Sequence, residues 1–159
     1  MANGLVYLRP KRVVYQSAFG PFRHSARAAW GSMIAWMNEN GIRREVTSGY
    51  GLALYCPENE DSKKQRYEAC IELPPSIAPE DTRGVRFQEL PGGAYVRRRH
   101  VGSVELLGDA IRELRGQFAS AHGLSIDPRR PLVEIYINDA TKVPSKDIRV
   151  DLCLPVSTG

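Results

Sequence analysis

The chain repeats one pattern of structural signals, and this repetition constrains the fold more than any other feature of the sequence. Gly20 is followed 21 residues later by Gly41, and Gly102 is followed 21 residues later by Gly123. Between the members of each pair, apolar residues recur every three or four positions, as on one side of an amphipathic helix. The second glycine of each pair suits the left-handed conformation that ends many helices. The sequence therefore predicts two helices, one in each half of the chain.

Two strands follow each predicted helix. GLALY (51–55) and LVEIY (132–136) are each followed by a polar loop and then by a second strand that ends in Leu-Pro. From the tyrosine to that leucine the chain counts 18 residues in both halves. An extended segment precedes each helix, at 12–20 and at 94–102. Each half therefore predicts the order strand, helix, strand, strand.

The two repeats are expected to form a single domain over residues 1–159. They cover about 5–75 and 85–156, and a stretch rich in Pro and Gly at 74–84 joins them. Neither half has enough strands to be stable alone. We predict an α+β fold with antiparallel sheets, helices on one face, approximate two-fold internal symmetry and a central ligand groove.

Composition excludes several classes of protein. The three cysteines form no CxxC pair and the three histidines share no metal-ligand spacing, so we expect no disulfide framework, no metal and no cofactor. The net charge of +4 is spread along the chain without a helix-turn-helix or RNA-binding pattern, which argues against direct nucleic-acid binding. No apolar run approaches the roughly 20 residues of a membrane span, and the N-terminus lacks a signal peptide. We expect a cytoplasmic protein that does not bind membranes.

Glu134 is the residue that does not fit its strand. A carboxylate among apolar strand residues is unfavourable by several kcal/mol unless it is paired, protonated or facing a cavity. Strand alternation places Glu134 and Tyr136 on one face and Val133 and Ile135 on the other. We assign the face of Val133 to the helix, so that Glu134 points away from it. The alternative is a structural ion pair between Glu134 and an arginine such as Arg149.

Matching the two halves gives the expected surroundings of Glu134. Ala53 corresponds to Glu134 and Tyr55 corresponds to Tyr136, so we expect Glu134 to face Ala53 across a cleft with room for a ligand. An apolar pocket with aromatic walls and one carboxylate suits an organic cation. The candidate ligand-binding residues are Glu134, Tyr136, Tyr55, Tyr95, Phe22, Trp30 and Glu68. Aromatic residues on helices also occur as core residues, which leaves Phe22 and Trp30 with a purely structural alternative, and Glu68 has the alternative of facing solvent.

Several segments resemble the GyrI-like small-molecule-binding domains, which occur as standalone proteins and as effector domains of AraC-type and MerR-type multidrug regulators. The matching segments are FGPFRHSARAAWGSMIAWMNENGI, GLALYCPENED, QRYEACIELP, ELPGGAYVRRRHVGSVELLGDAI, LVEIYIND and VDLCLPV. The resemblance implies a duplicated strand-helix-strand-strand fold with a central groove. It also implies that Glu134, in the EIYIND motif, is the acidic group that meets cationic or polar aromatic ligands.

The sequence departs from the family pattern at three places. Ala140 stands where the family often has Pro, and Glu68 stands where it commonly has Asp. Gly102, Ser103 and Val104 replace a frequent Gly-Pro-Tyr at the rim of the pocket. The resemblance spans about Arg9 to Val156, with about eight residues before it and about three after it, so we expect no DNA-binding domain. We therefore expect the standalone kind of member.

Two functions from different classes follow. In the first, the protein binds a hydrophobic, cationic aromatic compound and thereby senses or sequesters a drug or toxin, with Glu134 supplying the charge. In the second, which the resemblance permits, it hydrolyses cyclopropane-bearing, DNA-alkylating natural products, with Glu134 as general base or acid and Tyr136 or Tyr55 as a hydrogen-bond donor. A protein partner such as DNA gyrase follows from the family name alone.

Overall fold

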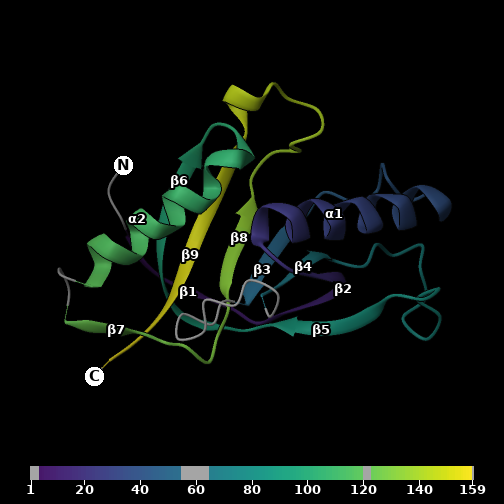
Figure 1. The fold of residues 1–159 in the computed structure, drawn as a ribbon. Helices are drawn as coiled ribbons and strands as arrows, with labels where there is room; N and C mark the ends of the chain where they lie inside the picture. Colours follow the sequence, from purple (N-terminus) through teal and green to yellow (C-terminus); the bar gives the residue numbers. More distant parts are fainter. Residues whose placement is uncertain (1–3, 55–64, 120–122, 159) are drawn as a thin grey trace.

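The computed structural model describes residues 4–54, 65–119 and 123–158, and its elements follow the two halves of the chain (Figure 1). The first half contains β1 (Gly4–Leu8), β2 (Lys11–Phe19), α1 (Phe22–Glu39), β3 (Tyr50–Leu54) and β4 (Arg66–Ile71). The second contains β5 (Arg86–Leu90), β6 (Gly93–Val101), the 3₁₀ turn η2 (Val104–Leu106), α2 (Leu107–Ala119), β7 (Leu124–Ile126), β8 (Leu132–Tyr136), the 3₁₀ turn η3 (Ser145–Asp147) and β9 (Arg149–Thr158).

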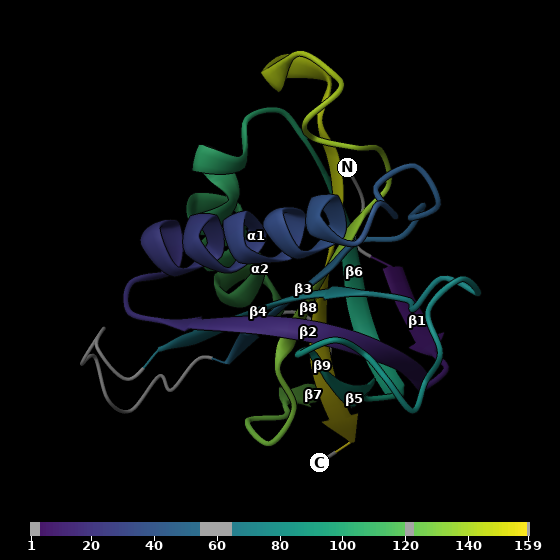
Figure 2. The same cartoon turned by 90° about the vertical axis from the view of Figure 1, so that its right-hand side faces the viewer.

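The strands form one antiparallel sheet, in place of the two that we expected. Its order is β1-β6-β9-β8-β3-β4-β2-β5, and β7 pairs with β9 beside this path. Exchanging each strand for its counterpart in the other half gives the same order read backwards. The central pair is β3 with β8, where Leu52 lies opposite Val133. Strands from both halves are therefore joined into a continuous surface, which curls so that β2 runs across the direction of β9 (Figure 2).

The outer strands are exchanged between the halves. β1 comes first in the chain, yet its partner is β6, with Gly4 opposite Arg97. β5 begins the second half, yet its partner is β2, with Lys11 opposite Leu90. Each half thus contributes an edge strand to the other.

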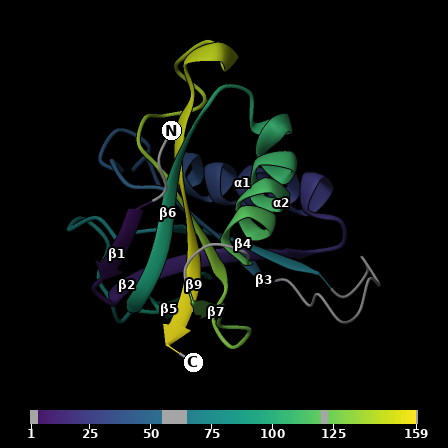
Figure 3. The same ribbon diagram turned by 90° about the vertical axis from the view of Figure 1, so that its left-hand side faces the viewer.

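Both helices lie on one face of the sheet, as expected (Figures 1 and 3). α1 is followed by Asn40 and then by Gly41, whose φ of +66° confirms the left-handed glycine at the end of this helix. Ser103 accepts a hydrogen bond from the backbone N–H of Glu105 and so caps the η2 turn that leads into α2. Among the described residues, no helix is long and apolar enough to cross a membrane.

The sheet is buried on both faces. On the helix-covered face, Met33 and Met37 of α1 belong to the same buried cluster as Tyr67 and Leu132. A second cluster fills the inside of the curl on the other face; it includes Leu52, Cys70, Tyr95, Val133 and Cys153. Apolar residues thus occupy both sets of alternate positions, and the pattern alone does not distinguish the faces.

The face assignment for Glu134 was wrong. Leu132 and Tyr136, which share its face, pack in the cluster that includes the helices, whereas Val133 and Ile135 pack in the cluster on the opposite face. Glu134 therefore points toward the helices. The reason for the error is that Val133 and Ile135 meet a second core, so their apolar character does not mark the helix-covered side.

Candidate functional site

A cavity of about 1460 Å³ lies between the two helices and the sheet face that they cover. Its wall is formed by α1, η2, α2, β3, β4, β8, the loop before β3 and the loop after β8. The apolar lining includes Phe22, Trp30, Ile34, Val104, Leu107 and Ile111. Ligand pockets commonly measure roughly 300–1,000 Å³, so this cavity has room for a large organic molecule.

Four polar atoms meet on the floor of this cavity. The hydroxyl of Tyr67 donates a hydrogen bond to Oε1 of Glu134 over 2.6 Å, and the hydroxyl of Tyr136 donates to the same oxygen over 3.3 Å. The indole Nε1 of Trp30 donates to the Tyr67 hydroxyl over 2.9 Å. The rings of Trp30 and Tyr136 meet edge to face, with centroids 5.4 Å apart. Strands β4 and β8 and helix α1 are thereby tied together at one carboxylate.

Glu134 is buried without a compensating cation. Its side chain belongs to a residue that is 5% exposed, and no Lys, Arg or His in the described part of the chain forms an ion pair with it. Burial raises the pKa of the Glu134 carboxyl, and the hydrogen bonds from Tyr67 and Tyr136 offset part of that rise. The alternative of a structural ion pair with Arg149 is therefore wrong for the described residues.

The two oxygens of the carboxylate differ in their surroundings. Both tyrosine hydroxyls donate to Oε1. Within the described ranges no hydrogen bond to Oε2 is found. A carboxylate can accept several hydrogen bonds, so Oε2 is the oxygen that can meet a ligand or a water molecule in the cavity.

Gly51 makes the contact between Tyr67 and Glu134 sterically feasible. Its Cα lies opposite that of Glu134 in the pairing of β3 with β8. A Cβ built on Gly51 would come within 2.0 Å of the Tyr67 hydroxyl and 2.5 Å of Oε1 of Glu134. The tyrosine therefore reaches over the bare backbone of β3, and the expected partner of Glu134, Ala53, instead lies opposite Leu132.

Four of the candidate residues line the cavity: Phe22, Trp30, Glu134 and Tyr136. Tyr55 lies outside the described residues. Tyr67, which is not among the candidates, also lines the cavity and at the same time belongs to the buried cluster on this face. Its signal was strand alternation, which places it on the face opposite Glu68 and, once the helix-covered face is known, on the side of Glu134.

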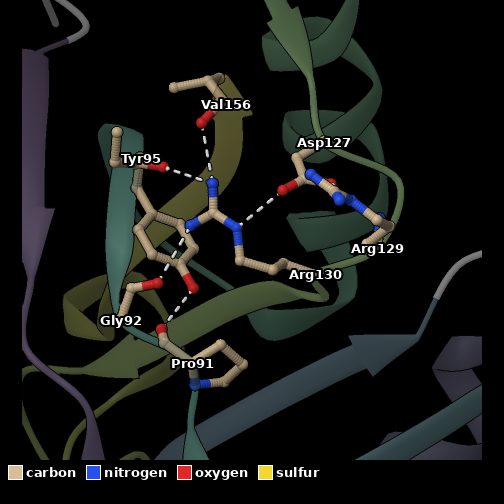
Figure 4. Close-up of polar contacts among 8 residues, drawn as sticks. Pro91, Gly92, Tyr95, Asp127, Arg129, Arg130 and Val156 are labelled. Atoms are coloured by element: carbon tan, nitrogen blue, oxygen red, sulfur yellow. Dashed lines mark hydrogen bonds and ion pairs between the residues drawn. The ribbon is translucent and has the colours of Figure 1, made fainter. Parts of the chain in front are cut away.

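Tyr95 is not at the cavity, which corrects its expected place. It belongs to the cluster on the opposite face, and its hydroxyl donates to the backbone oxygen of Pro91 over 2.6 Å. The guanidinium of Arg130 lies over its ring, 4.8 Å from the centroid (Figure 4). Arg130 also donates to Asp127 and to the backbone oxygens of Gly92, Ala94 and Val156. This is a structural junction between the loop before β8 and strands β6 and β9.

Glu68 is not at the cavity either. Strand alternation places it on the face opposite Tyr67, where Gln88 of β5 donates to its carboxylate over 3.1 Å and Arg66 lies 3.6 Å away. Its expected association with Glu134 failed because the two residues lie on opposite faces of the sheet. No group of three or more metal-binding side chains is found in the described ranges.

Comparison with known families and proteins identifies relatives of this chain. The model of the "GyrI-like small molecule binding domain" family matches residues 4–157. A probable transcriptional regulator, YgiV, of Escherichia coli K12 is 25% identical over 125 residues, covering 78% of this chain and 77% of its own. A DNA gyrase inhibitor of Cronobacter sakazakii is 26% identical over 151 residues, covering 88% and 87%.

Three solved structures share the fold. The C-terminal domain of EcmrR superposes with a TM-score of 0.73 at 17% identity, covering 99% of this chain and 98% of that one. SAV2435, in a structure bound to tetraphenylphosphonium, gives 0.66 at 14% identity, covering 99% and 94%. A hydrolase from Listeria innocua gives 0.64 at 19% identity, covering 98% and 91%.

Proposed function

The chain belongs to the GyrI-like small molecule binding domain family, and from that premise we propose that it binds a hydrophobic, cationic aromatic compound between its two repeats, about 5–75 and 85–156. The observation that carries the proposal is the buried carboxylate of Glu134, which has no cationic partner among the described residues and lies on the floor of the cavity. Binding would sequester the compound or signal its presence.

The chemistry of the floor supports a cation. A positive charge placed beside Oε2 would replace the hydration that burial has taken from the carboxylate. The rings of Trp30 and Tyr136 line the same space and can attract a cation through their faces. Tyr67 and Tyr136 hold Oε1, so the carboxylate is fixed before a ligand arrives, which lowers the entropy lost on binding.

Calorimetric titration with tetraphenylphosphonium tests the proposal. Glu134→Gln keeps an acceptor for Tyr67 and removes the charge, so we expect binding to weaken by roughly 1–3 kcal/mol, the scale of a charged interaction. Glu68→Gln removes an equally buried carboxylate on the other face of the sheet and should leave the affinity unchanged. Equal affinities of wild type and Glu134→Gln would refute the role of Glu134.

Two properties of Glu134 favour a second function, the hydrolysis of a cyclopropane-bearing compound. Burial raises the pKa of its carboxyl, and Oε2 accepts no hydrogen bond from the described residues, so this oxygen can act as a general base. In this reaction Glu134 takes a proton from water as the water oxygen attacks a cyclopropane carbon. The ring C–C bond breaks and its electron pair passes to a conjugated carbonyl. The Tyr136 hydroxyl, released from Oε1 when Glu134 becomes protonated, donates a hydrogen bond to the resulting oxyanion, and the oxyanion then takes up the proton from Glu134 to complete the addition of water.

Mass spectrometry of a cyclopropane-bearing alkylator incubated with the protein tests this second function. A product heavier by one water with wild type, and none with a Glu134→Gln variant that still binds the compound, would establish it. Equal turnover by both proteins would rule out Glu134 as the base. Inhibition of DNA gyrase stays a prediction for this chain, and a supercoiling assay with added protein tests it.

A further inference from the structure

The cavity carries opposite charges at its floor and toward solvent. Glu134 provides the negative charge on the floor, from strand β8. Besides the exposed His24, six arginine and lysine side chains also line the cavity, and all of them are exposed or half-buried. They are Arg27, Arg43, Arg44, Arg112, Arg115 and Lys142. The acidic residues of the described lining, besides Glu134, are Glu105, Asp109 and Asp139.

The basic residues approach the cavity from several elements. Arg27 lies on α1, Arg112 and Arg115 lie on α2, and the others lie in the loops before β3 and after β8. The two helices cover the face of the sheet toward which Glu134 points (Figures 1 and 3). These basic side chains are exposed or half-buried, and the solvent-facing part of the lining where they lie is called the entrance below. Glu134 is buried on the sheet, away from this solvent-facing part.

Some of this positive charge is neutralised within the protein and some is not. Arg43 and Lys142 share Asp139, at 3.7 Å and 3.9 Å, and Arg112 pairs with Asp109. Arg27 and Arg44 make no hydrogen bond or ion pair through their side chains to any residue of the described ranges. The entrance thus keeps an excess of positive charge that is available to a ligand.

Such a charge distribution disfavours a ligand that is only a cation. A simple lipophilic cation would cross a positive entrance to reach Glu134, and fields of this kind steer ligands by sign. A molecule with a cation at one end and an anion at the other would meet opposite charge at both positions. We propose that the ligand is an amphiphilic zwitterion, whose aromatic cation lies at Glu134 and whose acidic group, such as a carboxylate, lies at the basic entrance near Arg27 and Arg44. This inference rests on the proposed binding function.

A matched pair of compounds isolates the contribution of the acidic group. (4-Carboxybutyl)triphenylphosphonium and its methyl ester share one cation and differ in a single negative charge. The ester is the more apolar compound, and this alone changes its affinity. We therefore compare the proteins by the ratio of acid affinity to ester affinity that each one gives. Taking that ratio across variants cancels the difference in hydrophobicity, as in a double-mutant cycle.

The test is isothermal titration of both compounds into three proteins at low ionic strength. In the Arg27→Gln, Arg44→Gln double variant we expect the ratio of acid to ester affinity to fall by about threefold, the scale of exposed charge pairs. The control double variant, Arg86→Gln, Arg149→Gln, loses the same charge at exposed positions outside the cavity lining and should keep the wild-type ratio. The wild-type ratio should also decline as salt is added, because exposed charges are screened.

Three outcomes are distinguishable. A ratio that falls only in the Arg27→Gln, Arg44→Gln variant supports the zwitterionic ligand. An equal ratio in all three proteins, with both compounds bound, overturns this inference and leaves the proposed cation site intact. Failure of both phosphonium compounds to bind the wild-type protein overturns the proposed function and this inference with it.

Discussion

Gly51 and Glu134 face each other across the central strand pair. Because Gly51 has no side chain, Tyr67 can donate its hydrogen bond to Glu134. The ring of Tyr67 reaches over the glycine to place its hydroxyl 2.6 Å from the carboxylate. One glycine in β3 thus determines how a residue of β4 contacts a residue of β8.

Gly51→Ala should therefore damage the site. The new methyl group would overlap the Tyr67 hydroxyl, so we expect the tyrosine to move and the free energy of unfolding to fall by about 1–3 kcal/mol, as for other overpacked interiors. Urea denaturation measures the loss. Gly31→Ala is the matched control, because a Cβ there meets no atom within 4 Å and the position is helical. An unchanged stability of Gly51→Ala would contradict the steric argument.

Tyr67→Phe should shift the pH dependence of ligand binding. The Tyr67 hydroxyl lowers the pKa of Glu134 by stabilising its charged form, so its removal should raise that pKa further. As the pH falls, protonation of Glu134 removes the charge that binds a phosphonium cation. We therefore expect the affinity, measured against pH, to be lost at a higher pH in the variant than in wild type. Tyr50→Phe, whose hydroxyl contacts Lys11 and Glu72, should keep the wild-type profile. Coinciding profiles for wild type and Tyr67→Phe would show that this hydroxyl does not control Glu134.

Glu134→Gln should stabilise the protein without ligand at neutral pH. Burial raises the folded-state pKa of Glu134 above its ordinary value of 4.5, so the folded state favours the protonated form. This preference for the protonated carboxyl stabilises the folded state fully below pH 4.5, the ordinary pKa. The stabilisation is lost as the pH rises through the raised pKa of the folded state. The advantage of Glu134→Gln over wild type should therefore grow between about pH 4.5 and the raised pKa. Urea titrations across this range measure it, and a constant difference would contradict the prediction.

Arg130→Lys should destabilise the junction at Tyr95 without affecting ligand binding. A lysine keeps the charge but lacks the planar set of donors that reaches Asp127 and three backbone oxygens, so we expect a loss of about 2 kcal/mol. In Arg129→Lys the side chain is 85% exposed, and the change should stay within about 0.5 kcal/mol. Thermal unfolding compares the two. An altered phosphonium affinity in Arg130→Lys at a temperature where it is folded would place this junction in communication with the cavity.

The sequence was sufficient to predict the helices, most strands and the isolated acid at Glu134, because each leaves a local pattern. It was not sufficient to assign the face of that acid. Val133 is as apolar as a residue that faces a helix, but it packs in the second core inside the curl. Strand alternation therefore showed that Val133 and Glu134 lie on opposite faces, but it did not show which face the helices cover. The face became known only from the packing of the whole sheet.

The neighbour of Glu134 was missed for a different reason. Ala53 is its counterpart in the other half, and we had taken the counterpart for the neighbour. Strands β3 and β8 run antiparallel with Leu52 opposite Val133, so the residue beside Glu134 is Gly51, two positions from the counterpart. Tyr67 was missed with it, because only a glycine at this position lets a residue of the next strand reach the carboxylate.

The exchange of β1 and β5 between the halves bears on how the chain is completed during synthesis. The pairing of Gly4 with Arg97 joins positions 93 residues apart, so β1 leaves the ribosome well before its partner strand has been synthesised. Until then its backbone N–H and C=O groups are open to pairing with other chains. Contacts so distant in sequence also slow the closing steps of folding. Each half therefore lacks an edge strand that the other half supplies, and neither half can complete its part of the sheet alone.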